Sequence, residues 1–99
     1  MKHKCYLFFK TLGTKLKINI LFKLKEKPLN VTELSQSLNQ ERSKVSHALK
    51  TLLICKFITV RKIGKKRIYS INNDTINPLL NLVELHIKNY CNFCKEEKL

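Results

Sequence analysis

Between residues 41 and 71 the spacing of the apolar side chains changes from that of a helix to that of a strand. Over 41–54 they recur at i, i+3, i+4 and i+7, which predicts an amphipathic helix; they are Val45, Ala48, Leu49 and Leu52. The next two runs, FITVRK and KRIYSI, are rich in β-branched and aromatic residues and meet around Ile63-Gly64-Lys65. They predict a β-hairpin.

A short helix is also predicted just before residue 41. Asn30 suits the N-cap position, and Glu33 completes the spacing of a capping box. Val31, Leu34 and Leu38 follow at the helical spacing i, i+3 and i+7, and Asn39–Gln40 supplies a turn after them. Two short helices joined by a tight turn and followed by a basic hairpin are the parts of a winged helix-turn-helix. In that fold the second helix enters the major groove of DNA and the hairpin lies along the backbone.

Three further helices are predicted around this unit, over 4–12, about 15–26 and about 76–90. Thr14 can cap the second of them, which would bury Ile18, Leu21 and Leu24. The run TKLKINI within it also alternates like a strand, so periodicity alone leaves that segment open. The last helix has an apolar stripe of Ile76, Leu79, Leu80, Val83, Ile87 and Tyr90. The predicted fold class is mainly α with a β-hairpin wing (α+β), in one domain of residues 1–99.

The charge of the chain favours a polyanionic partner. Twenty Lys and Arg against seven Asp and Glu give a formal net charge of +13, and no acidic residue occurs from Arg42 through Asn73. Such a protein attracts nucleic acid first and anionic membrane second. Solvated surface lysines are the alternative explanation of composition alone, but the concentration of the cations in one region favours double-stranded DNA.

Several other classes of protein are excluded or disfavoured. No stretch approaches the roughly twenty apolar residues of a membrane span, and the start MKHKCYLFFK lacks the features of a signal peptide. The expected location is therefore the cytoplasm, where four cysteines are thiols or metal ligands rather than structural disulfides. The chain has no paired carboxylates, nucleophile–base set or phosphate-binding glycine loop, so it is not expected to be an enzyme.

Three segments, LGTKLKINILFKL, VTELSQSLNQERSKVSHALKTL and KFITVRKIGKKRIYSI, resemble the ArsR/SmtB family of repressors. The resemblance runs from about Phe8 to Ile71 and is most specific in the V-S-x-x-L-K-x-L of Val45 to Leu52. It implies a repressor that pairs as a homodimer through residues 1–12 and 76–99 and binds a pseudo-palindromic operator. Non-specific architectural DNA binding and a winged-helix protein-interaction module remain the alternatives. The positions that would contact DNA are Gln40, Arg42, Ser43, Lys44, Ser46, His47 and Lys50 in the recognition helix, and Arg61, Lys62, Lys65, Lys66 and Arg67 in the wing.

The effector sites of the family are not reproduced. Asn30 and Thr32 stand where many members have a Cys-x-Cys metal site, and of the four ligand positions on and before the last helix only His86 is retained. What remains is the set His86, Cys91 and Cys94, which could bind Zn²⁺ or another thiophilic metal, or form a redox disulfide. Cys5 and Cys55 are candidates for a fourth ligand. The competing interpretation is that these cysteines only pack as small hydrophobes; Cys55 in particular is expected in the core. Lys56 replaces the glycine that usually ends the family's recognition helix.

Overall fold

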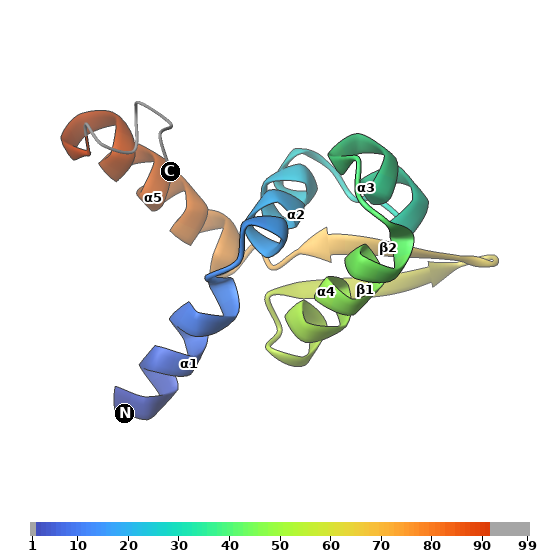
Figure 1. Ribbon diagram of the computed structural model, residues 1–99, viewed down its shortest axis with the longest axis horizontal. Helices are drawn as coiled ribbons and strands as arrows, with labels where there is room; N and C mark the ends of the chain where they lie inside the picture. The colour runs from blue at the N-terminus through green and yellow to red at the C-terminus, as the bar shows by residue number, and fades with distance from the viewer. Residues whose placement is uncertain (1, 92–99) are drawn as a thin grey trace.

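The computed structural model describes residues 2–91 of the chain, with side chains from residue 4 onward. Its fold is mainly helical with one hairpin, as predicted (Figure 1). In chain order the elements are α1 (Lys2–Leu12), α2 (Lys15–Glu26), α3 (Val31–Leu38), α4 (Arg42–Ile54), β1 (Ile58–Ile63), β2 (Lys66–Ile71) and α5 (Ile76–Tyr90). Among these residues no helix combines the length and the apolar content needed to span a membrane.

The segment that the sequence left open between helix and strand is the helix α2. The Thr14 side chain caps it by accepting a hydrogen bond from the Lys17 N–H at 3.3 Å, as predicted. Its buried residues are Ile20, Leu21 and Leu24. The expectation that Ile18 is buried was therefore wrong: Ile18 is half-buried. Because α2 packs against α3, α4 and β2 together, its buried side is turned toward Ile20.

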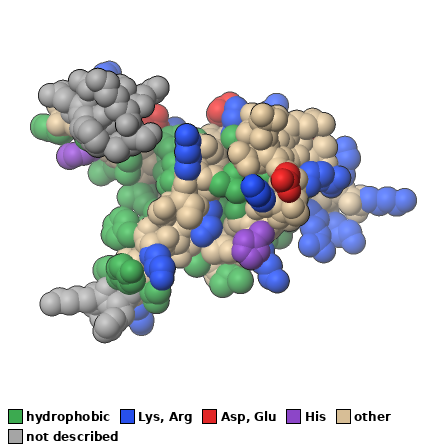
Figure 2. Space-filling model, viewed as in Figure 1, with side chains coloured by type: hydrophobic (Ala, Val, Ile, Leu, Met, Phe, Trp, Pro, Cys, Tyr) green, Lys and Arg blue, Asp and Glu red, His purple; other side chains and the backbone are tan. Residues whose placement is uncertain are grey.

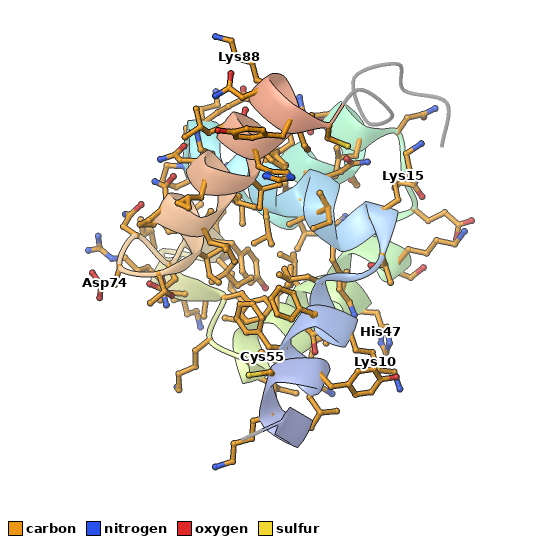
Figure 3. All side chains as sticks on the ribbon, turned by 90° about the vertical axis from the view of Figure 1, so that its left-hand side faces the viewer. Lys10, Lys15, His47, Cys55, Asp74 and Lys88 are labelled. Carbon is orange, nitrogen blue, oxygen red and sulfur yellow. The ribbon has the colours of Figure 1, made fainter. Side chains whose placement is uncertain are left out.

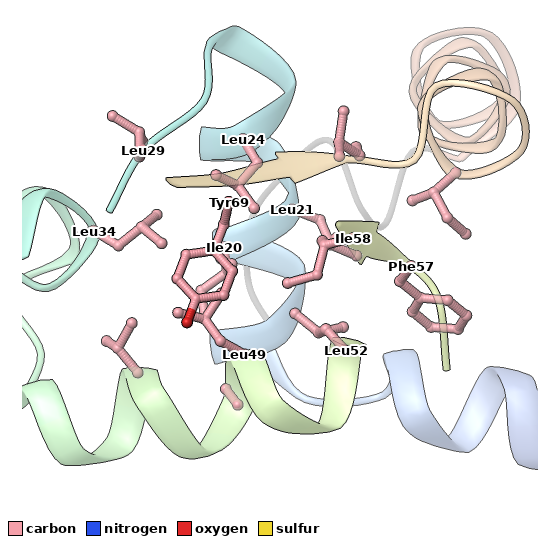
Figure 4. Packing of buried hydrophobic residues seen from close by; sticks show 14 of the residues in the cluster. Ile20, Leu21, Leu24, Leu29, Leu34, Leu49, Leu52, Phe57, Ile58 and Tyr69 are labelled. Carbon is pink, nitrogen blue, oxygen red and sulfur yellow. The ribbon is translucent and has the colours of Figure 1, made fainter. Parts of the chain in front are cut away.

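The core lies between α2, α3 and α4 on one side and the base of the hairpin on the other (Figure 4). All four apolar residues predicted on the inner side of α4 are buried. Leu34 of α3 and Ile58 and Tyr69 of the hairpin complete the contact. The buried side of α4 fixes which of its side chains remain for a partner.

The entry into α3 and the turn after it have the predicted chemistry. Asn30 Oδ1 accepts from the Glu33 N–H at 2.8 Å, and Glu33 Oε1 accepts from the Asn30 N–H at 2.9 Å. These two bonds form the capping box. The following Asn39 has a left-handed backbone with φ 53°, which asparagine tolerates better than most residues. The turn sets the angle between α3 and α4.

The hairpin is tied to the body of the protein at its base and free at its tip. β1 and β2 pair antiparallel from Ile58↔Ile71 to Ile63↔Lys66. Gly64 begins the two-residue turn with φ +64°, a backbone that favours glycine. At the base, the backbones of Leu29 and Tyr69 exchange hydrogen bonds of 3.1 and 2.9 Å. The tip of the hairpin therefore extends away from the body of the protein, while these hydrogen bonds hold the other end in place (Figure 1).

α1 packs on the segment that links α4 to β1. The rings of Phe8 and Phe57 meet edge to face with centroids 4.9 Å apart, and Cys55 Sγ lies 3.8 Å from Thr11 Oγ1. Cys55 is exposed, so its prediction as a core residue was wrong. The cause is the end of α4: the chain turns away after Cys55, and Phe57 fills the core there instead, with 3% of its surface exposed.

Lys56, which stands where the family usually has a glycine, adopts a left-handed backbone conformation. Its φ is 61°, and the bonds from the Lys56 N–H to Leu53 O (3.0 Å) and from the Phe57 N–H to Leu52 O (2.9 Å) form a Schellman motif. A left-handed backbone costs a residue with a side chain roughly 1–2 kcal/mol, and glycine little.

We therefore expect Lys56→Gly to raise the free energy of unfolding by about 1 kcal/mol and the Tm by about 4–8 °C. Thermal unfolding at one fixed protein concentration measures this, because association also shifts the Tm. Lys50→Gly, within α4, is the control and should lower stability by about 1 kcal/mol. A lower Tm for Lys56→Gly would show that the lysine side chain stabilises this end of the helix.

Candidate nucleic-acid interface

The outer side of α4 is exposed and polar from Arg42 to Lys50, and the exposed Ile54 lies at the C-terminal end of the helix. Burial of its apolar side leaves every predicted recognition-helix position facing solvent: Gln40, Arg42, Ser43, Lys44, Ser46, His47 and Lys50 are all exposed. With 13 residues, α4 is about 20 Å long. A helix of this size fits the major groove of B-DNA, which is about 12 Å wide.

The wing presents a second group of cations. Its predicted positions Arg61, Lys62, Lys65, Lys66 and Arg67 are all exposed. The antiparallel register places Lys62 directly opposite Arg67. Like charges at opposed positions destabilise a hairpin, and a polyanion bound along the wing would offset that repulsion.

The recognition helix and the wing meet at one hollow of about 250 Å³. Arg42, at the start of α4, lies on its wall together with the three wing residues from Lys65 to Arg67. The sequence did not predict its other contributors, which come from the start of α3 and from β2; they are Asn30, Val31, Thr32 and Tyr69. A hollow that joins cations from two elements beside hydroxyl groups suits a phosphate.

Within residues 4–91 none of these cations forms an ion pair with an acidic side chain. In the part of the chain that the structure describes, the one ion pair joins Lys25 to Glu84 at 3.6 Å and lies between α2 and α5. Lys and Arg side chains surround α4 and the wing, whereas hydrophobic side chains cover α1 and α5 at the other end (Figure 2). The molecule thus has a cationic end and an apolar end.

The apolar end is formed by exposed side chains of the first and last helices. Large hydrophobic residues on α1 and α5 have between 42% and 77% of their surface exposed; they are Tyr6, Leu7, Phe9, Leu82, Val83, Leu85 and Tyr90. Phe8, Leu79 and Ile87 beside them are half-buried. Soluble monomers rarely expose a large continuous apolar patch. This surface, which we call the α1/α5 face, therefore has the character of an interface.

The predicted metal or redox set is only partly within the described residues. His86 is exposed, and its ring centroid lies 5.5 Å from that of Tyr90. Cys91 ends α5 and is half-buried, while Cys94 lies outside the described residues. Among residues 4–91 no three His, Cys, Asp or Glu side chains are grouped to hold a metal ion. Asn30, at the family's Cys-x-Cys position, belongs to the α3 capping box. A site of His86, Cys91 and Cys94 remains a prediction.

An α3–turn–α4 unit with an exposed second helix and a basic hairpin defines a winged helix-turn-helix protein. Residues 14–60 match the family model of bacterial regulatory proteins of the arsR family. Rv0081 of Mycobacterium tuberculosis is 33% identical in sequence, and the similarity covers 88% of this chain and 87% of that one with a TM-score of 0.80. The chain belongs to the ArsR family of bacterial regulatory proteins, which are transcriptional regulators and not enzymes.

Two other solved structures have the same fold. The transcriptional repressor PagR of Bacillus anthracis is 28% identical, over 82% of this chain and 93% of that one, with a TM-score of 0.72. The homodimeric winged helix-turn-helix DNA-binding domain of Mb0332 from Mycobacterium bovis is 19% identical, over 91% of this chain and 89% of that one, with a TM-score of 0.78. No curated protein matches the chain in sequence.

Proposed function

We propose that this protein binds double-stranded DNA as a homodimer and represses transcription from a pseudo-palindromic operator. The observation that carries the proposal is the exposed cationic surface that α4 and the wing form together, with Arg42 and Lys65 to Arg67 around one hollow. In the proposed complex α4 lies in the major groove, where its serines and His47 meet base edges. The cations of the wing neutralise backbone phosphates. The cytoplasm, where bacterial DNA is accessible, is the proposed place of action.

The α1/α5 face supports the homodimer. It lies at the opposite end of the molecule from the wing (Figure 2), along a longest dimension of 44 Å. Two copies joined there would leave both α4 helices open to DNA, and a two-fold axis between them would match the symmetry of a pseudo-palindrome. The homodimeric state of Mb0332 and the repressor activity of PagR are consistent with this arrangement.

Selection of duplexes from a randomised pool tests the proposal. A regulator should enrich one sequence with related half-sites and bind it roughly a thousandfold or more tightly than competitor DNA. Equal affinity for all duplexes would instead indicate an architectural DNA-binding protein. If the protein binds no duplex even at low salt, the remaining interpretation is that it is a winged-helix module that binds other proteins.

The wing should act on all sequences alike. Lys65→Ala or Arg67→Ala removes one phosphate contact from each subunit, so affinity should fall for selected and competitor duplexes together. The slope of log K against log salt should become shallower by about 0.9 for each lost contact, or about 1.8 for the dimer. Lys88→Ala, an exposed lysine of α5, is the control and should leave the slope unchanged. Wing variants with the wild-type slope would contradict the proposed position of the hairpin.

Metal or redox control of DNA binding stays a prediction from the sequence, carried by His86, Cys91 and Cys94. Cys91 caps the C-terminal end of α5 and directly follows Tyr90, which belongs to the α1/α5 face. A ligand there would act through the dimer and not through the DNA-contacting side of α4.

A further inference from the structure

A second groove lies along the edge of α4 that faces α2. It has a volume of about 460 Å³ and separates the first turn of α2 from the exposed side of α4. The N-cap and first turn of α2 contribute Thr14, Leu16 and Lys17, and α4 contributes Ser43, Lys44, His47 and Ala48. Lys15, also in the first turn of α2, projects to the same side of the molecule as His47, and Asp74 projects to the opposite side (Figure 3).

The lining of this groove suits a sugar–phosphate backbone. Lys17 and Lys44 supply cations, and no acidic side chain lines the groove. The Thr14 hydroxyl accepts from the Lys17 N–H at 3.3 Å and has no acceptor of its own among the described residues, so its hydrogen is available to donate. Leu16 and Ala48 supply an apolar surface that a deoxyribose can contact.

The position of the groove relative to the wing adds a geometric argument. At 3.6 residues per turn, Arg42 and Lys44 project about 200° apart around α4. Arg42 faces the hollow beside the wing, and Lys44 faces the groove beside α2. A helix of about 10–12 Å diameter in a groove about 12 Å wide has one DNA strand along each edge. The two hollows therefore face different strands.

We propose that the groove between the first turn of α2 and α4 binds a backbone phosphate on the strand across the major groove from the one that the wing contacts. Lys17 and Lys44 neutralise this phosphate, and the Thr14 hydroxyl donates a hydrogen bond to it. The inference rests on the proposed function, because it takes α4 to lie in the major groove. It adds α2 to the DNA-binding surface, which sequence analysis confined to the recognition helix and the wing.

The first test is the salt dependence of Lys17→Ala on the duplex that the wild-type protein selects. The slope of log K against log salt should become shallower by about 1.8 for the dimer, about 0.9 for each lost contact. Lys23→Ala is the matched control, because Lys23 is also a half-buried lysine of α2 but lies at the far end beside Glu26. It should keep the wild-type slope. Lys17→Gln, which retains most of the side chain, provides a second uncharged variant if the alanine variant unfolds.

The second test assigns the strand. Single neutral methylphosphonates are placed at successive positions flanking each half-site, and each should weaken wild-type binding where a phosphate is contacted. Lys17→Ala should lose this sensitivity on one strand, and Lys65→Ala should lose it on the other. If Lys17→Ala keeps the wild-type slope and full sensitivity at every position, the α2 groove does not bind DNA. If the wild-type protein selects no duplex at all, the proposed function itself fails.

Discussion

Replacing Val83 with aspartate is expected to separate the proposed homodimer into monomers at micromolar concentration. Val83 belongs to the α1/α5 face, and 42% of its surface is exposed in the single chain. Burying an unpaired carboxylate in an apolar interface costs at least several kcal/mol. Affinity for the selected duplex should fall by about 100-fold or more, because the second half-site is then no longer held at high effective concentration. Sedimentation and DNA titration measure the two effects.

Asn81→Asp is the control for this substitution. Asn81 is exposed on the side of α5 that also carries Glu84 and Lys88, about 160° around the helix from Val83, and receives the same new charge. It should remain a dimer and lose little DNA affinity. A Val83→Asp protein that stays dimeric would place the interface on a different surface.

The second large effect is expected for the exposed side of α4. Ser46→Ala or His47→Ala should reduce the preference for the selected duplex over competitor DNA by roughly 1–3 kcal/mol, about 5- to 150-fold, if a base contact is lost. The salt slope should change little, because neither substitution removes a lysine or an arginine. The ratio of the two affinities, measured at one salt concentration, separates this effect from that of the wing.

Ser37→Ala is the control for this pair. Ser37 is an exposed serine of α3 whose hydroxyl donates to Leu34 O within the same helix at 3.2 Å. It should leave the ratio unchanged. If the Ser46 and His47 variants both keep the wild-type ratio, these side chains do not read the sequence of the DNA.

The helices and the hairpin were predictable because their signals are local. The capping box of Asn30 and Glu33, the apolar spacing of α4 and the glycine at the hairpin turn each act within a few residues. The errors occurred where tertiary packing decides the outcome. Which side of α2 is buried depends on three neighbouring elements, and Cys55 is exposed because Phe57 takes the core position after α4 ends.

The candidate site was predictable in its side chains but not in its shape. Periodicity identified the outer side of α4, and composition identified the wing, since both properties belong to one continuous segment. Each of the two hollows, in contrast, is lined by residues from separate segments of the chain. One joins Thr32 to Arg67, and the other joins Thr14 to His47. Contacts between residues more than thirty positions apart depend on how the helices pack, which apolar spacing does not specify.

The edge-to-face contact of Phe8 and Phe57 has a consequence for regulation. Phe57 lies in the short link between α4 and β1, immediately before β1, while Phe8 belongs to a helix of the α1/α5 face. The two proposed binding events, with a second copy of the chain and with DNA, therefore involve elements that contact each other through these two rings. In thermodynamic terms they are linked: the factor by which pairing strengthens DNA affinity equals the factor by which DNA strengthens pairing. An effector would need no contact with DNA to change the occupancy of the operator. It would be enough for the effector to bind more tightly to one arrangement of the Phe8–Phe57 contact than to another.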